Sequence, residues 1–478
     1  MKLTELKVRN DYLKLDEEFY HKVMPSPLKH PKLLSYSSDA AALLGLDPAK
    51  LDEAELTRLI NGETFCDGSD PYAMCYAGHQ FGYYVPRLGD GRAINIGTAN
   101  GWHMQLKGAG QTRYSRQGDG RAVLRSSVRE YLMSEAMNGL GIPTSRALAL
   151  IGSEHDVARE QWEKGAIVLR LSPSWIRFGS FEYFYYKKKY GKLEALADFA
   201  IAESYPHLAK SEDRYYLFIK EVSERTAKLM AAWQAVGFNH GVMNTDNMSI
   251  AGLTIDYGPY AFLDHYDIDY ICNHTDTEGR YSFGNQPYIA QWNLSRLMVA
   301  LSPLVQQERM EPLLDDFRTI YTDTYARLMG AKLGLRTHGQ EDRLLIRSLL
   351  KLLQEQRVDY TAFFRALSQY DGKSAELEHL FLLPSALHTW LETYDARLKR
   401  EAYDPLQRHA DMLRTNPKYI LKNYMLQEAI TQAETGDVTG INTLLKLAKD
   451  PYGEHPEYED FARSTPTEQR NIKLSCSS

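Results

Sequence analysis

The feature that most constrains this sequence is the run His240–Asn247, followed nine residues later by Asp256-Tyr257-Gly258. The catalytic loop of protein kinases has the pattern H-R-D-x-x-x-x-N, and the metal-binding aspartate lies in D-F-G. This register keeps the histidine, the asparagine and the second aspartate, whereas Val242 stands in the place of the catalytic aspartate. A valine cannot accept a proton from an attacking hydroxyl. The pattern therefore predicts a nucleotide-binding enzyme with a kinase-type metal site and a chemistry other than ordinary phosphorylation.

The composition is that of an ordinary soluble globular protein, with 44% hydrophobic and 25% charged residues in 478. This length suits two or three domains, or one two-lobed catalytic unit with extensions. The net charge of -6 gives no overall attraction to nucleic acid or to an anionic membrane, so neither is an expected partner. The first residues lack the apolar core of a signal peptide, and only four cysteines occur, so we expect a cytoplasmic protein.

The sequence from residue 86 to 177 has the order of elements found in a kinase small lobe. Asn100-Gly101 is a strong hairpin signal between two alternating segments, and a probable helix is closed by Gly139 and Gly141. The order strand, strand, helix, strand, strand is predicted at residues 93–96, 102–107, about 121–138, 147–151 and 166–171. Residues 1–85 are interpreted as an N-terminal extension that packs on this core, with a short helix at 39–44.

The remainder, residues 178–478, is predicted to be a large helical lobe with a helical C-terminal extension and tail. Apolar residues recur at helical spacing from Tyr215 to Val236, and Gly237 ends that helix just before the loop 240–258. Short apolar runs at 248–250 and 253–255 predict a small hairpin that delivers the second aspartate. We therefore predict an α+β, protein-kinase-like, two-lobed fold.

Metal and phosphate ligands can be assigned within this frame. Magnesium prefers hard oxygen ligands, so the amide oxygen of Asn247, the carboxylate of Asp256 and nucleotide phosphates would form a complete site. Lys107 ends a predicted strand, where a kinase places its phosphate-binding lysine. Glu130 and Glu135 both lie in the following helix, and spacing alone does not choose the partner of the lysine.

Two further segments suit phosphate binding. The loop Gly89-Asp90-Gly91-Arg92 allows close backbone approach to a phosphate and adds one charge, although it also suits a plain hairpin turn. Arg170 and Arg177 lie where a kinase hinge binds adenine, a task that needs no arginine. Because planar guanidinium groups match phosphate oxygens, this pair indicates a nucleotide bound in the reverse direction.

Three segments together resemble a known family over nearly the whole chain. The run His240–Asn247 with Asp256-Tyr257-Gly258, the loop Leu88–Arg92 and the segment Leu106–Arg116 are similar to those of selenoprotein O, also called YdiU. The resemblance implies a kinase-like fold, long classed as a pseudokinase, that transfers AMP from ATP to hydroxyl side chains of proteins. Transfer of UMP is also implied for bacterial members, so ATP or UTP is the expected co-substrate, with Mg²⁺ or Mn²⁺.

The resemblance also implies roles for individual residues. Lys107 resembles the phosphate-binding lysine and Glu130 its helix partner, and Asp246 resembles the proton acceptor. Asn247 and Asp256 are similar to the metal ligands. Further nucleotide contacts are implied for Gly89, Gly91, Arg92, Asp119, Gly120, Arg170, Arg177 and Asp256. Reversal of the nucleotide would place its terminal phosphates near these cations, which can stabilise the charge that develops on pyrophosphate.

A redox switch is a further implication of the resemblance. Cys272 lies in the region of an activation segment, and Cys476 is close to the end of the chain, where some animal members carry selenocysteine. A disulfide between them would tie the tail to the active-site region. The alternative is two free cytosolic thiols.

Two other functions are compatible with the loop. A phosphotransferase of the aminoglycoside-kinase type also begins its catalytic loop with His-Gly, but normally keeps an aspartate at the position of Val242. A catalytically inactive ATP sensor would not need a full set of metal and phosphate ligands. The resemblance to selenoprotein O instead implies that the acceptors are Ser, Thr or Tyr residues of other proteins.

Overall fold

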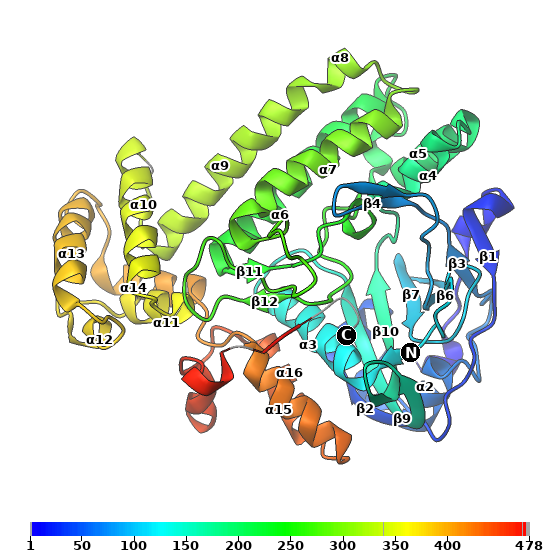
Figure 1. Cartoon of the computed structure of the whole chain (residues 1–478), viewed down its shortest axis with the longest axis horizontal. Coiled ribbons are helices and arrows are strands. Elements are labelled where there is room, and N and C mark those ends of the chain that lie inside the picture. The colour runs from blue at the N-terminus through cyan, green and yellow to red at the C-terminus, as the bar shows by residue number, and fades with distance from the viewer. Residues whose placement is uncertain (1, 338, 471, 475–478) are drawn as a thin grey trace.

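A single antiparallel sheet is the framework of the smaller part of the molecule in the computed structural model, which describes residues 2–337, 339–470 and 472–474 (Figure 1). The strand order is β1-β3-β6-β7-β10-β9-β2, and β8 pairs with β10. The strands are β1 (Tyr20–Lys22), β2 (Lys32–Tyr36), β3 (Tyr72–Met74), β6 (Ala93–Ala99), β7 (Trp102–Lys107), β8 (Ala122–Val123), β9 (Arg146–Ala158) and β10 (Trp162–Ser172).

The sheet confirms the predicted order of elements in residues 86–177. Strands β6 and β7 are joined at Asn100 and Gly101, whose φ angles of 53° and 79° are those of a two-residue hairpin turn. The first 85 residues do more than pack on this core, because β1 and β3 extend the sheet at one edge and β2 pairs with β9 at the other.

One helix of this part, α3 (Leu124–Gly139), packs against β9 and β10. It begins three residues later than predicted, because β8 pairs with β10 immediately before it. Helices α15 (Asn423–Glu434) and α16 (Thr439–Lys449) cover α3 from the other side. The contact is close at Gly139, where a Cβ atom would lie 2.0 Å from the carbonyl oxygen of Ala448.

The rest of the chain is largely helical, as predicted. Long helices α6, α7 and α9 pack together, and α10–α14 form a second cluster with its own apolar core (Figure 1). The remaining helices are α1 (Ser38–Leu43), α2 (Glu53–Ile60), α4 (Phe178–Tyr186), α5 (Tyr190–Ser204), α6 (Arg214–Val236), α7 (Gln286–Leu301), α8 (Gln307–Met310), α9 (Pro312–Lys332), α10 (Gln340–Glu355), α11 (Tyr360–Leu367), α12 (Ala375–Glu378), α13 (Pro384–Leu398) and α14 (Pro405–Thr415).

In the described part of the chain, four short strands lie outside the large sheet. They form two separate two-stranded sheets: β4 (Gly78–Gln80) with β5 (Tyr83–Val85), and β11 (Phe238–Asn239) with β12 (Ala261–Phe262). Of the helices in the described ranges, none combines the length and the apolar character that crossing a membrane requires.

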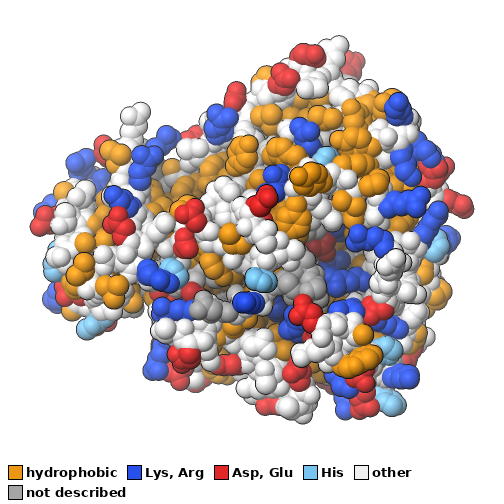
Figure 2. Space-filling model, in the orientation of Figure 1, with side chains coloured by type: hydrophobic (Ala, Val, Ile, Leu, Met, Phe, Trp, Pro, Cys, Tyr) orange, Lys and Arg blue, Asp and Glu red, His pale blue; other side chains and the backbone are white. Residues whose placement is uncertain are grey.

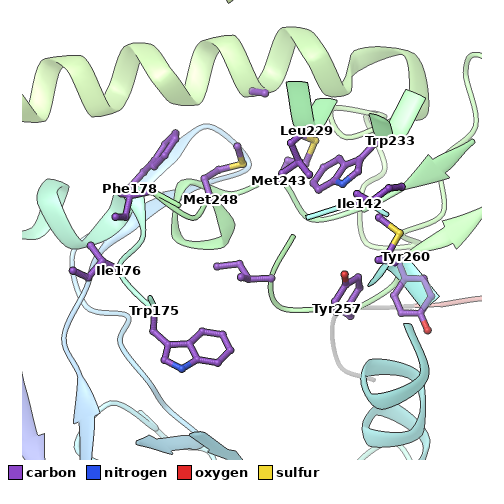
Figure 3. Packing of buried hydrophobic residues seen from close by; sticks show 14 of the residues in the cluster. Ile142, Trp175, Ile176, Phe178, Leu229, Trp233, Met243, Met248, Tyr257 and Tyr260 are labelled. Carbon is purple, nitrogen blue, oxygen red and sulfur yellow. The ribbon is translucent and has the colours of Figure 1, made fainter. Parts of the chain in front are cut away.

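The predicted hairpin at residues 248–255 is wrong. Ser249 forms a bridge with Arg177, and Thr254 forms one with Thr144, so the two segments pair with separate parts of the chain. The apolar runs are explained by burial instead: Met248 packs near Phe178 in the core that joins the sheet to the helices (Figure 3). Burial of such side chains stabilises this junction.

The α+β class is confirmed by this arrangement. The likeness to a protein kinase and the domain limits at residues 85 and 177 stay predictions.

Candidate active site

A cavity of about 560 Å³ lies between the sheet and the helical part of the molecule. Figure 2 shows basic side chains gathered in a hollow right of its centre. All the predicted nucleotide, metal and catalytic residues line this cavity: Gly89, Gly91, Arg92, Lys107, Asp119, Gly120, Arg170, Arg177, Asp246, Asn247 and Asp256. Segments separated by more than a hundred residues in the chain therefore meet in one place.

The loop that carries Asp246 and Asn247 is held in position by contacts of His240. Helix α6 ends at Gly237, whose φ of 75° is the left-handed conformation that suits a helix C-terminus. The buried ring of His240 then stacks on Trp233, and its Nε2 donates to the carbonyl of Ile255 at 2.9 Å. Burial lowers the pKa of His240. This histidine therefore orients the loop as a neutral group.

Asp256 is surrounded by three cations. Its Oδ1 accepts from Arg170 at 2.6 Å and its Oδ2 accepts from Arg177 at 2.6 Å, while Lys107 Nζ lies 3.6 Å from Oδ1. Burial alone would raise the pKa of Asp256, but Arg177, Arg170 and Lys107 hold it well below the usual range. Its φ of 56° lies in the left-handed region, which few residues other than glycine adopt, and the two arginines fix this conformation.

The structure decides between the two candidate glutamates of α3. Lys107 Nζ lies 2.5 Å from Glu130 Oε2, and Glu130 Oε1 accepts from Arg170 at 2.7 Å. Glu135 instead pairs with Arg146, with distances of 2.7 and 2.8 Å to its two carboxylate oxygens. Glu130 therefore belongs to the cation cluster of the cavity, although it does not itself line the cavity.

Asp246 has the opposite electrostatic environment. Its Oδ2 accepts from Gln80 Nε2 at 3.2 Å, whereas its buried Oδ1 has no hydrogen-bond partner among the described residues. Arg177 donates to the backbone carbonyl of Asp246, not to its carboxylate. Burial raises the pKa of Asp246 to about 7, against an opposing effect of Arg177. A carboxylate of this kind is matched to proton transfer near neutral pH.

Asn247 presents an oxygen to the cavity. Its Nδ2 donates to the carbonyl of Val242 at 3.0 Å, which leaves its Oδ1 for a cation. Among the described residues no group of three or more His, Cys, Asp or Glu side chains could hold a metal ion. The hard oxygens of Asn247 and Asp256 fit Mg²⁺ or Mn²⁺ when phosphate oxygens and water supply the other ligands.

The Gly-containing loop lines the cavity. Gly89 has a φ of 95°, and a Cβ atom there would lie 2.5 Å from the ring of Tyr114. Arg92 lines the cavity and forms no ion pair with a carboxylate among the residues that the structure describes, although Glu130 and Asp256 act on its charge from a greater distance. It can therefore contact an anion. Asp119, by contrast, forms an ion pair with Arg159 at 2.9 Å.

The comparison with known proteins decides the family. A family model described as "Protein adenylyltransferase SelO" matches residues 2–449. The chain belongs to the SelO family.

Relatives within the SelO family extend this match over the full length. "Protein nucleotidyltransferase YdiU" of Thioalkalivibrio sulfidiphilus is 48% identical over 490 residues, which cover 100% of both chains. The proteins of the same name from Myxococcus xanthus and Thiobacillus denitrificans are each 47% identical, and the alignments cover 100% of this chain and 99% of the relative. The resemblance found in the sequence is thereby confirmed.

Three residues that contact the site in this SelO-family chain are not predicted from the sequence: Trp175, Tyr76 and Gln80. The guanidinium group of Arg170 lies 4.5 Å from the ring centroid of Trp175, and that of Arg177 lies 4.5 Å from the ring centroid of Tyr76. Gln80 donates to Asp246. Tyr76 and Gln80 belong to an aromatic, Gly-containing stretch for which the sequence offers no recognisable motif. The one signal that could have pointed to a turn there is the clustering of Gly78 and Gly82 with aromatic residues.

Proposed function

We propose that this chain is a protein nucleotidyltransferase that moves AMP from ATP to Ser, Thr or Tyr hydroxyls of proteins and releases pyrophosphate. The observation that carries the proposal is the cluster of Lys107, Arg170 and Arg177 around Asp256. A kinase needs one lysine here for the α- and β-phosphates. Three buried cations fit the larger charge of a departing pyrophosphate.

A kinase-like arrangement of two lobes is part of this proposal. The strand, strand, helix, strand, strand order, the pair Lys107–Glu130 and the loop after α6 support it. We place the small lobe at residues 86–177 and the large lobe at 178–478, with residues 1–85 as an extension that completes the sheet. The nucleotide would enter with its terminal phosphates first and its base toward the mouth.

The proposed reaction balances within the cavity. The acceptor oxygen forms a bond to the α-phosphorus, and the bond from that phosphorus to the oxygen bridging the β-phosphate breaks. Asp246, with a pKa of about 7, takes the acceptor proton. Lys107, Arg170 and Arg177 stabilise the charge on the leaving pyrophosphate. Val242 is buried and takes no part in proton transfer.

Asn247 and Asp256 would hold Mg²⁺ or Mn²⁺, which neutralises phosphate charge when bound. Both oxygens of Asp256 contact arginines in the structure, so its carboxylate is held in place before a cation arrives. Competition experiments with the two metals, and with ATP and UTP, would determine which metal and which nucleotide the chain prefers.

Redox control through Cys272 and Cys476 stays a proposal, because Cys476 lies outside the described residues. What supports it is the position of the tail, since the backbone amide of His274 donates to the carbonyl of Leu474 at 2.8 Å. The tail therefore runs beside the residues that follow Cys272. Comparison of Cys476→Ser with the unchanged chain under oxidising conditions tests whether activity depends on the pair.

Labelled nucleotide separates the proposed function from the alternatives. The chain is incubated with Mn²⁺, a hydroxyl-bearing protein acceptor and ATP labelled on either the α- or the γ-phosphorus. Label from the α-position alone supports adenylyl transfer. Label from the γ-position identifies a phosphotransferase, and nucleotide binding without any transfer identifies a sensor. UTP labelled at the α-position, run in parallel, gives the nucleotide preference.

A further inference from the structure

The hairpin of β4 and β5 (residues 78–85) lies directly against the catalytic loop. The amide of His79 donates to Thr245 Oγ1 at 2.7 Å, Gln80 donates to Asp246, and the amide of Phe81 donates to Tyr281 Oη at 2.8 Å. Phe81 and Gly82 form the turn with φ angles of 50° and 88°. Positive φ at Phe81 is strained, and the contacts of the hairpin with the catalytic loop hold it in place.

The outer side of this hairpin continues into exposed aromatic rings. Tyr83 is 80% exposed and Tyr288 on α7 is 66% exposed. Tyr84 packs on Tyr186 of α4 with ring centroids 4.1 Å apart, and Trp292 lies one helical turn beyond Tyr288. We name this set the aromatic surface: Tyr83, Tyr84, Tyr186, Tyr288 and Trp292. Figure 2 shows hydrophobic side chains gathered over the region of β4 and α7.

His79 joins the aromatic surface to the active site. Its ring lies 5.5 Å from that of Tyr84 and 5.4 Å from that of Trp292, while its Nδ1 lies 3.0 Å from the buried carboxylate of Glu182. The same oxygen of Glu182 accepts from Thr245 Oγ1 at 3.1 Å. The surface and the loop of Asp246 are therefore parts of one continuous packed unit.

Two arginines next to the aromatic surface, Arg280 and Arg296, form no ion pair with an acidic side chain in the described part of the chain. The guanidinium groups of Arg280 and Arg296 lie 4.7 and 5.1 Å from the ring centroid of Trp292, and neither forms an ion pair with a carboxylate there. The Nε of Arg280 is buried and has no hydrogen-bond partner among the residues that the structure describes. Half-buried guanidinium groups that lie on an aromatic ring without a carboxylate partner favour an anionic partner.

We infer that the aromatic surface and its two arginines are the docking site for an acidic, extended segment of the acceptor protein. This inference rests on the proposed function and names the substrate class. Tyrosine, tryptophan and arginine are the residue types that dominate binding energy at protein interfaces. The sheet of β4 and β5 has no third strand among the described residues, and β4 is occupied by its contact with Thr245, so an extended segment can add at the more exposed β5 edge. The hairpin then directs the segment toward Asp246.

Two synthetic peptides of equal length test the inference. Each carries one Ser, one Thr and one Tyr, separated by glutamates in the first peptide and by lysines in the second. With α-labelled ATP we expect the glutamate peptide to be modified with at least a tenfold higher kcat/KM. Equal modification of both peptides would overturn the docking site and leave the proposed function intact. No label on either peptide, with no release of pyrophosphate, would defeat the proposed function as well.

Variants locate the effect on the molecule. Arg280→Ala with Arg296→Ala is expected to raise KM for the glutamate peptide about tenfold and to leave KM for ATP unchanged. Tyr83→Ala, an exposed change that does not disturb folding, is expected to act in the same direction. The matched control removes two exposed arginines from the distant α10–α13 region, by Arg343→Ala with Arg400→Ala.

If the control pair raises KM for the glutamate peptide by the same factor, the docking site is not at the aromatic surface. The preference for the glutamate peptide would then reflect the net charge of the protein. Competition by a single-stranded oligonucleotide but not by an unreactive glutamate peptide would assign the surface to nucleic acid instead. Melting curves of all variants, compared with that of the unchanged chain, show whether a loss of activity reflects loss of fold.

Discussion

Replacement of Asp246 by asparagine is expected to stabilise the nucleotide-free protein while it abolishes activity. The carboxylate is buried, one of its oxygens has no hydrogen-bond partner among the described residues, and its pKa is raised from 3.8 to about 7. The folded state therefore binds this proton more tightly than the unfolded state does. Such a group lowers stability progressively as pH rises from about 4 to 7, and its effect is constant above that range.

The size of the effect follows from the two pKa values. One unit of pKa is worth about 1.4 kcal/mol, so the raised pKa of Asp246 lowers the stability of the fold by about 1.5 kcal/mol at pH 5, where folding requires proton uptake, and by about 4 kcal/mol at pH 8, where the buried carboxylate is largely ionised. Asparagine has no corresponding pH dependence. The difference in free energy of unfolding between Asp246→Asn and the unchanged chain should therefore grow by about 2 to 3 kcal/mol between these pH values.

Urea denaturation at pH 5 and pH 8, without nucleotide or metal, measures this difference. Asp315→Asn, which removes a carboxylate whose side chain is 80% exposed, gives the background effect of losing one surface charge. A difference that stays the same at both pH values would refute the reasoning, because Asp246 would then be solvated. In the unchanged enzyme, kcat/KM for transfer should rise with pH, reach half of its maximum near pH 7 and level off above about pH 8, since the base must be ionised.

Three further predictions concern the cations and carboxylates of the cavity. Arg92→Ala breaks no ion pair in the described structure, so the melting temperature should not change. KM for ATP should rise about 10- to 100-fold, which corresponds to the loss of one charged hydrogen bond. An unchanged KM would show that Arg92 does not contact the nucleotide. Glu130→Gln leaves Lys107 and Arg170 without their shared buried carboxylate and should lower the free energy of unfolding by about 3 to 5 kcal/mol in urea titration. Asp256→Asn should abolish transfer at any metal concentration, and activity of this variant in excess Mn²⁺ would count against the metal assignment. Chelation of the metal by EDTA should reversibly abolish the activity of the unchanged chain.

The sequence predicted the parts of the site that lie close together in the chain. The spacing of His240, Asn247 and Asp256 follows a loop of fixed length, and the hairpin at Asn100 follows from turn chemistry, so both could be found without coordinates. The choice between Glu130 and Glu135 could not be made in this way. They are five residues apart and so point to different sides of α3, and only the packing of the helix on the sheet decides which one meets Lys107.

Long-range contacts account for the rest. Arg170 and Asp256 are 86 residues apart in the chain, and no local pattern indicates that they form an ion pair. The short apolar runs at 248–255 were interpreted as a hairpin because periodicity cannot separate a strand from a buried loop over three residues. The hairpin at residues 78–85 was missed as a part of the site, since its role depends on contacts with a loop more than 160 residues later.

The orientation of the bound nucleotide distinguishes adenylyl transfer from phosphorylation. A crystal structure of the chain with Mn²⁺ and an ATP analogue that cannot be cleaved between the α- and β-phosphates would show it. We expect the γ-phosphate within ion-pair distance of Lys107, Arg170 or Arg177, with the α-phosphorus facing Asp246. A γ-phosphate that faces Asp246, with the α-phosphate at Lys107 as in a kinase, would contradict this expectation.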